Sequence, residues 1–409
     1  MNQADIVPTL FDSRLSRSSC RRQRFLQRSG LTGLFALLGL WSGAAHAATF
    51  TIPDGDVAAL KSALATANTN DEADTINLAA DGTYILTTPD NNTNGKNALP
   101  VIANDLFATG TELTLNGDGA RIKRSSAGAT PDFRILQISY GATVSITGLT
   151  IANGQASGIF PANAGGGVYN DHGMLSLSNC TLNGNSANSD GGGIYNYGAN
   201  GNATLSLSNC TLNRNSAGYG GGIYNDGDSG NAALSLSNCN LKGNSATYGG
   251  GGGICNNGRP GNATLNLSHC TLNANSANYG GGIYSFSFGG NATLSLSNCT
   301  LNGNSANSND GGGIYNDGHD GSAALNLSNC TLNGNSANSE GGGIYNYIED
   351  SVLMSVTNCT LNANSANYGG GIYNTAQLGS TVLRVSNCTL SGNSAAKGGG
   401  GIYNNGHDK

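Results

Sequence analysis

The chain has 409 residues, of which 64 are glycine, 7 are proline and only 10% are charged. Such a composition is compatible with disorder, but the glycines recur at fixed positions in a repeat, which favours an ordered fold. The formal net charge is −6. An acidic chain disfavours nucleic acid and anionic membranes as partners, because both carry negative charge.

Residues 1–47 are predicted to be a secretory signal peptide. Six arginines precede an apolar run from Leu31 to Trp41, and the small residues of Ala45-His46-Ala47 provide a cleavage site. The Arg21-Arg22 pair is also reminiscent of a twin-arginine signal, so that export route stays open. The apolar run is too short to span a bilayer, and we expect an exported chain without a transmembrane segment after cleavage. Loss of the leader removes six basic and two acidic residues, which leaves 12 basic and 22 acidic ones.

Residues 48–140 differ from the rest of the chain and predict an amino-terminal cap with irregular first coils. Asp56 is a suitable N-cap for a helix that extends to Ala67, with Leu60 and Leu64 on one face. An atypical first unit is expected because a solenoid must cover the open end of its core. Short strands are predicted at residues 49–52, 75–78, 84–87, 113–115 and 135–138.

Residues 141–409 consist of a repeat of 29 to 31 residues. After a degenerate first copy, each copy resembles Leu205-Ser-Leu-Ser-Asn-Cys-Thr-Leu-Asn-Arg-Asn-Ser-Ala217 followed by Gly220-Gly-Gly-Ile-Tyr-Asn225. Self-similarity of this length, without helical periodicity, is typical of a solenoid in which each copy forms one coil. One cysteine per copy marks the period: Cys180, Cys210, Cys239, Cys270, Cys299, Cys330, Cys359 and Cys388.

The apolar pattern within one copy predicts three short strands per coil. Leu205 and Leu207 alternate with serines, as in a half-buried strand, but Leu212 is out of phase with them. The phase changes at Asn209, a residue type that tolerates left-handed backbone angles, so we expect a bend there. A second bend follows the next strand, and residues 220–225 supply the third strand. The predicted fold class is therefore all-β, a right-handed parallel β-helix with an N-terminal helical cap, whose handedness follows the general chirality of parallel crossovers.

Coils that stack ~4.8 Å apart place identical side chains above one another in columns. Leucine, cysteine and isoleucine columns would form the core, and asparagine columns would satisfy backbone groups at the bends through their amides. The exported location permits disulfides, but we expect buried thiols, because in-register Cβ atoms lie farther apart than a disulfide favours. Cys255 replaces a tyrosine; it is predicted to be exposed and unpaired, and a dimer through it stays open.

The segment Leu212-Asn-Arg-Asn215 followed by Gly221-Gly-Ile223 resembles the paired F-x-x-N and G-G-A-I motifs of chlamydial polymorphic outer membrane protein repeats. The similarity covers roughly residues 141–409, with leucine where those motifs have phenylalanine. Related right-handed β-helix repeats occur in many bacterial surface proteins. The resemblance implies a secreted or surface-displayed β-helix, often an adhesin or an autotransporter passenger domain.

Seven tyrosines that follow Gly-Gly-Gly-Ile form the first candidate binding surface. Because the isoleucine should point inward, the adjacent tyrosine is expected to point outward, and a column of phenol rings could stack against sugar rings. The alternative is that the rings stack on one another and only stiffen this face. The candidate residues are Tyr195, Tyr224, Tyr284, Tyr315, Tyr345, Tyr373 and Tyr403.

The repeats offer little for catalysis or metal binding. A β-helix polysaccharide lyase or glycoside hydrolase stays as the alternative function, by analogy of fold. Such enzymes need clustered carboxylates near a basic residue, and near-identical copies provide no unique constellation. Acidic loop residues are scattered and the histidines have no metal-ligand spacing. We therefore predict no catalytic residues, no metal and no cofactor.

These features together favour a non-catalytic secreted or surface-exposed protein for adhesion or cell-envelope interaction. Repeated side-chain columns suit a polymeric or multivalent partner, either a polysaccharide or a host or cell-surface protein. The expected location is extracellular or on the outer cell surface, with the periplasm as an alternative. The last copy is expected to expose a sheet edge that invites self-association.

Overall fold

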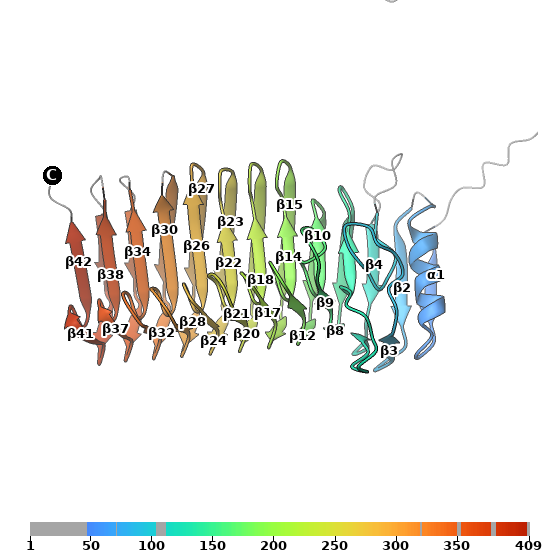
Figure 1. Cartoon of the computed structure of the whole chain (residues 1–409), viewed down its shortest axis with the longest axis horizontal. Coiled ribbons are helices and arrows are strands. Elements are labelled where there is room, and N and C mark those ends of the chain that lie inside the picture. The colour runs from blue at the N-terminus through green and yellow to red at the C-terminus, as the bar shows by residue number, and fades with distance from the viewer. Residues whose placement is uncertain are drawn as a thin grey trace, which may run out of the picture. The chain divides into compact units, whose positions relative to one another are not determined.

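The computed structural model describes residues 47–70, 72–103, 112–319, 321–349, 353–377 and 382–406. These residues form a parallel β-solenoid whose coils follow one another from the blue helix α1 to the red strand β42 (Figure 1). The predicted signal peptide, apart from Ala47, lies outside the described residues.

The first coils are covered by the single helix of the described residues, α1 (Val57–Ala67). The Asp56 side chain caps it by accepting a hydrogen bond from the Ala59 N–H at 2.8 Å, which satisfies a donor that the first helical turn leaves unpaired. Leu60 and Leu64 are buried against the first strands. The predicted helix and its N-cap are therefore confirmed.

Each regular coil contributes one strand to each of four parallel sheets in the described part of the chain. The largest sheet has 12 described strands. In spatial order they are β1 (Thr49–Ile52), β2 (Asp74–Leu78), β4 (Glu112–Asn116), β7 (Thr143–Thr147), β11 (Met174–Ser178), β15 (Asn202–Ser208), β19 (Asn231–Ser237), β23 (Asn262–Ser268), β27 (Asn291–Ser297), β31 (Ser322–Ser328), β35 (Leu353–Thr357) and β39 (Val382–Ser386).

The next sheet around the coil has 11 described strands. They are β3 (Thr83–Leu86), β5 (Arg121–Arg124), β8 (Thr150–Ala152), β12 (Thr181–Asn183), β16 (Thr211–Asn213), β20 (Asn240–Lys242), β24 (Thr271–Asn273), β28 (Thr300–Asn302), β32 (Thr331–Asn333), β36 (Thr360–Asn362) and β40 (Thr389–Ser391).

A third, narrow sheet has nine described strands, most of only two residues. They are β9 (Gln155–Ala156), β13 (Ser186–Ala187), β17 (Ser216–Ala217), β21 (Ser245–Ala246), β25 (Ser276–Ala277), β29 (Ser305–Ala306), β33 (Ser336–Ala337), β37 (Ser365–Tyr368) and β41 (Ser394–Gly398).

The fourth sheet has 10 described strands and closes the coil. They are β6 (Leu136–Ile138), β10 (Val168–Asp171), β14 (Ile194–Tyr197), β18 (Ile223–Asp226), β22 (Ile254–Asn257), β26 (Ile283–Phe288), β30 (Ile314–His319), β34 (Ile344–Ile348), β38 (Ile372–Ala376) and β42 (Ile402–Gly406).

The parallel β-helix is thus confirmed, but the expectation of three strands per coil is wrong. The predicted bend at Asn209 is present, with a φ of 52°. The following bend, at Arg214, has a φ of 53°, and it leads into the short strand β17 instead of a longer turn. A strand of two residues is too short to show the alternation from which strands are recognised, so the narrow sheet could not be predicted from the pattern.

The core consists of columns that run through successive coils. Leu205 pairs with Leu234 and Leu212 with Leu241, all fully buried. The Cys180 N–H donates to Sγ of Cys210 at 3.4 Å, so the cysteines stack as well. The described cysteines are free thiols, and all are buried except the half-buried Cys388, as predicted for the column.

Cys255 departs from the expectation. It has no exposed surface, because it takes the place of a ladder tyrosine between Tyr224 and Tyr284, and that ladder is itself covered. The prediction that Cys255 is exposed is wrong, and a dimer through this thiol has no accessible sulfur to use.

Candidate functional site

The outer face of the 12-stranded sheet carries columns of small polar side chains. In β15, Leu205 and Leu207 point into the core with exposed fractions of 0% and 2%, whereas Ser206 between them is exposed. In-register pairing places Ser206 beside Ser235 of the next coil. Each outward position therefore becomes a column that runs along the solenoid.

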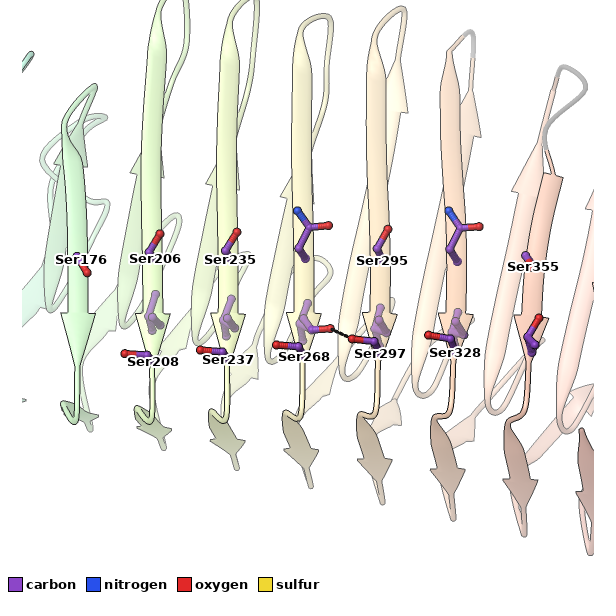
Figure 2. Close-up of a pocket in the computed structure, with 18 residues that line it drawn as sticks. Ser176, Ser206, Ser208, Ser235, Ser237, Ser268, Ser295, Ser297, Ser328 and Ser355 are labelled. Atoms are coloured by element: carbon purple, nitrogen blue, oxygen red, sulfur yellow. Dashed lines mark hydrogen bonds between the residues drawn. The ribbon is translucent and has the colours of Figure 1, made fainter.

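Two of these columns line a shallow groove of about 630 Å³ that extends from β11 to β35. Figure 2 shows labelled serines at matching heights on successive strands. Leucines from the same strands lie between the columns. One column is Ser176, Ser206, Ser235, Asn266, Ser295, Asn326 and Ser355, and the other is Ser208, Ser237, Ser268, Ser297, Ser328 and Thr357.

The groove carries polar side chains between leucines, and none of its lining residues is charged. Its lining residues are serine, asparagine, threonine and leucine. Hydroxyl and amide groups both donate and accept hydrogen bonds, but none of these side chains titrates near neutral pH. The groove can therefore hold a neutral, hydrogen-bonding chain and cannot supply a general acid or base from its own lining.

The tyrosine ladder predicted as an exposed binding column is mostly buried. Tyr195 is 2% exposed and Tyr373 is 7% exposed, and Tyr284, Tyr315 and Tyr403 are half-buried. The expectation that these rings face solvent is wrong. Tyr224 and Tyr345, each 8% exposed, complete the set.

The rings instead stack on one another. The centroids of Tyr345 and Tyr373 are 5.3 Å apart with an interplanar angle of 6°, and those of Tyr373 and Tyr403 are 5.2 Å apart at 4°. Stacking of this kind stiffens the 10-stranded sheet. The alternative that the sequence left open is therefore the one that the geometry supports.

The segment that joins the narrow sheet to the 10-stranded sheet covers the ladder. A Cβ atom on Gly250 would lie 2.3 Å from Cδ1 of Tyr284, so the backbone of this segment packs directly on a ladder ring. Tyr279, in the equivalent segment of the next coil, places its ring centroid 6.1 Å from that of Tyr284. The glycine run thus allows the backbone to pack against the tyrosine rings. This contact cannot be predicted from the alternation of inward and outward side chains along a single strand.

A buried polar cluster interrupts the ladder beside Cys255. The Tyr195 hydroxyl donates to Oδ2 of Asp226 at 2.5 Å, and Nδ2 of Asn257 donates to Oδ1 at 2.8 Å. Burial raises the pKa of Asp226, and it raises the pKa of the nearby Asp190 to about 6. Burial also raises the pKa of the Cys255 thiol, so this sulfur stays protonated and is not an activated nucleophile.

The covering segment carries tyrosines that are more exposed than most of the ladder, and the sequence did not single them out. Tyr219 is 40% exposed and Tyr248 is 76% exposed, and Tyr279 is half-buried. All three precede a glycine run in the covering segment. The signal that could have identified them is the Tyr-Gly-Gly step, which recurs in these copies just before the ladder tyrosine.

A second aromatic group extends the 10-stranded sheet. Phe288 and His319 stack with centroids 5.4 Å apart, and the Arg259 guanidinium lies 4.7 Å from the Phe288 centroid. His319 Nε2 is 3.2 Å from Oε1 of Glu349. Burial raises the pKa of Asp317, on the same strand as His319, to about 6. Phe288 thus already has a stacking partner in His319 and a cation beside its ring in Arg259.

No group of three or more histidine, cysteine, aspartate or glutamate side chains in the described ranges is placed to hold a metal ion. No helix within the described ranges has the length and apolarity needed to cross a bilayer.

A family model described as the Chlamydia polymorphic membrane protein repeat matches residues 179–197, 329–347 and 387–405. Each match begins at an asparagine with positive φ, such as Asn179 at 52°, and ends in or just after a strand of the 10-stranded sheet. The matched unit is therefore the part of the coil that contains the cysteine, the inward asparagine and the ladder tyrosine. A comparison with curated proteins returned no match.

Proposed function

We propose that this chain, a parallel β-solenoid that carries Chlamydia polymorphic membrane protein repeats, is a non-catalytic, surface-exposed protein with an adhesin-like role. The single observation that supports the proposal best is the continuous hydroxyl and amide groove on the 12-stranded sheet. The partner that suits this groove is an extended, uncharged polymer, and a polysaccharide has that chemistry.

The repetition of the groove favours avidity over one tight contact. Neighbouring coils offer the same side chains at ~4.8 Å intervals, so a repetitive chain can form many equivalent hydrogen bonds. Each such bond contributes only about 0.5–1.5 kcal/mol net in water. Several weak contacts along one partner combine into useful affinity when they form at the same time.

The groove lining gives no support to the alternative function, a polysaccharide lyase or glycoside hydrolase. Glycoside hydrolysis normally uses a pair of carboxyl groups on either side of the scissile bond, and the groove residues include no aspartate or glutamate. The matched repeat family supports an outer membrane or cell-surface location for the proposed adhesin.

A charge-insertion experiment tests the groove. Glutamates at the exposed positions Ser206 and Asn266 would place charge in the groove without touching the core. A matched pair, Thr271→Glu with Thr360→Glu, changes two exposed positions on the outer face of the 11-stranded sheet. Binding to an array of neutral polysaccharides and to cell surfaces is then compared for the wild type and both pairs.

We expect the groove pair to lose at least about tenfold in binding, equal to about 1.4 kcal/mol, and the control pair to bind as the wild type does. Equal binding by the groove pair and the wild type would contradict the groove. Failure of an external protease to cleave the chain on intact expressing cells would contradict the surface location.

A further inference from the structure

We infer that Tyr219, Tyr248 and Tyr279 form a second, aromatic binding site, whose ligand is an uncharged saccharide. This site lies on the segment that covers the tyrosine ladder, and its residues are separate from those that line the serine groove. The inference therefore goes beyond the proposed function and does not depend on it.

The register of the covering segment places Tyr219 and Tyr279 in one row, two coils apart. Asp190 pairs with Tyr219, and Gly250 pairs with Tyr279, in isolated parallel bridges. The Gly220 N–H donates to the Gly250 carbonyl at 3.1 Å, which continues the row by one coil. Tyr219, Gly250 and Tyr279 thus occupy equivalent positions in three successive coils.

Tyr248 stands out of this row because its copy has two additional glycines. Five glycines, residues 249–253, follow Tyr248, whereas three follow Tyr219 and Tyr279. The extra backbone is accommodated by hydrogen bonds from the Tyr248 and Gly249 N–H groups to the Gly218 carbonyl, at 3.2 and 3.0 Å. As a result Tyr248 projects outward and is 76% exposed.

The ring of Tyr219 lies against the backbone at Gly249. A Cβ atom at Gly249 would be 1.9 Å from Cε1, 2.2 Å from Cδ1 and 2.4 Å from Cζ of Tyr219. Three ring atoms at nearly the same distance from one point mean that the ring rests on the glycine with one face. Tyr219 as a residue is nevertheless 40% exposed, so the side of the ring away from the glycine is the one that a ligand can reach.

An exposed aromatic face and nearby hydrogen-bond acceptors match the chemistry of a pyranose ring. The C–H face of the sugar buries apolar surface on the phenol ring, and its hydroxyl groups can donate to carboxylates in charge-assisted hydrogen bonds. Asp190 and Asp310 flank the row, since the Gly280 N–H donates to the Asp310 carbonyl at 3.0 Å in the coil that follows Tyr279. Both carboxyl groups disfavour an anionic sugar, which selects for a neutral one.

Tyr140 provides a matched control. It is 73% exposed, close to the 76% of Tyr248, but its ring contacts His172 at the other end of the repeats, 5.8 Å between centroids. Gly249→Ala provides a second probe, because it keeps all three tyrosines and forces the Tyr219 ring off the backbone.

The experiment is isothermal titration of the purified full chain with cellohexaose and chitohexaose, and with a galacturonate hexamer as the charged comparison. We expect at least one neutral hexasaccharide to bind and the galacturonate hexamer to bind more weakly. Tyr248→Ala and Tyr219→Ala should each weaken binding about 3- to 10-fold, as expected for loss of one aromatic contact. Gly249→Ala should weaken it comparably, and Tyr140→Ala should leave it unchanged. Circular dichroism melts verify that each variant is folded.

Failure of both neutral hexasaccharides to bind would overturn the inference. The inference would also be overturned if Tyr248→Ala kept the affinity of the wild type, or if Tyr140→Ala lost as much affinity as Tyr248→Ala. Tighter binding of tetramethylammonium than of either sugar would indicate a cation site instead and would overturn it as well. The serine-groove pair, Ser206→Glu with Asn266→Glu, loses any hexasaccharide binding that the groove contributes. The binding that remains in this pair should still weaken about 3- to 10-fold when Tyr248→Ala is added. Complete loss of binding in the groove pair, with no loss in the tyrosine variants, would support the groove and overturn the aromatic site.

Discussion

The Asn215 side chain donates its Nδ2–H to Oδ1 of Asn244 at 3.0 Å, and the same oxygen accepts the backbone N–H of Asn215 at 3.0 Å. Nδ2 of Asn244 in turn donates to the Leu212 carbonyl and to Asn275, both at 3.0 Å. One buried amide therefore serves two donors and two acceptors of neighbouring coils. This arrangement lets a polar column exist inside the solenoid without unpaired groups.

We predict that Asn244→Ala lowers the free energy of unfolding by about 2–3 kcal/mol, because it leaves buried donors of Asn215 without an acceptor. Urea denaturation followed by circular dichroism measures the loss, and amide hydrogen exchange at Asn215 should accelerate. Asn266→Ala is the control, since Asn266 is an exposed groove residue. Equal stability of the two variants would contradict the role of the column.

The cysteines should differ in reactivity according to burial. Cys388 is half-buried, whereas Cys255 has no exposed surface and burial raises its pKa. We predict that iodoacetamide at pH 8 labels Cys388 first and labels Cys255 only in denaturant, because alkylation requires an accessible thiolate. Peptide mapping by mass spectrometry follows both sites. Cys388→Ser should remove the fast-labelled peptide, and native labelling of Cys255 at the same rate as Cys388 would contradict the burial.

The glycine before each ladder strand should tolerate no side chain. A Cβ atom at Gly221 would lie 2.3 Å from the Ser245 carbonyl oxygen of the next coil. Gly221→Ala is therefore expected to cost about 1–3 kcal/mol through overpacking. Gly128, where an added Cβ would meet nothing within 4 Å, is the control, and Gly128→Ala should change stability by less than about 0.5 kcal/mol. Thermal unfolding of both variants measures the difference.

Buried carboxyl groups should make the fold less stable as the pH rises. The folded pKa of Asp190 is about 6, above its ordinary value of 3.8, so the folded state binds more protons than the unfolded state between these values. Its contribution to the free energy of unfolding therefore decreases from about pH 4 to about pH 6. Asp190→Asn removes this contribution, and its gain in melting temperature over the wild type should be larger at pH 7 than at pH 4.

Asp118→Asn is the matched control for this pH dependence, because Asp118 is exposed. Its melting temperature should follow that of the wild type at both pH values. A gain for Asp190→Asn that is the same at pH 4 and pH 7 would show that the effect is not one of ionisation.

The sequence predicted the features that depend on local chemistry repeated at a fixed interval. The bend at Asn209 follows from the tolerance of asparagine for positive φ, and the Leu205 and Leu207 columns follow from strict alternation. Neither requires knowledge of distant residues. The N-cap at Asp56 was recognisable for the same reason, since a capping side chain acts within its own turn.

The features that escaped prediction depend on contacts between different parts of the coil. Tyr284 does lie on the outside of its strand, yet Gly250 of the covering segment packs on its ring. Cys255 occupies a position in the same ladder and has no exposed surface. The exposure of Tyr219 and Tyr248 could not be predicted. It depends on how the Tyr219 ring packs on Gly249 of the next coil, a contact that the repeat period does not reveal.

The in-register stacking of nearly identical coils also bears on how the gene can change. Because each coil bonds only to its two neighbours, a recombination event that deletes or duplicates one full copy would leave every remaining column in alignment. The solenoid would shorten or lengthen by one strand spacing, ~4.8 Å. The groove would lose or gain the side chains of one coil. Reach and avidity could then vary among descendants without any new fold.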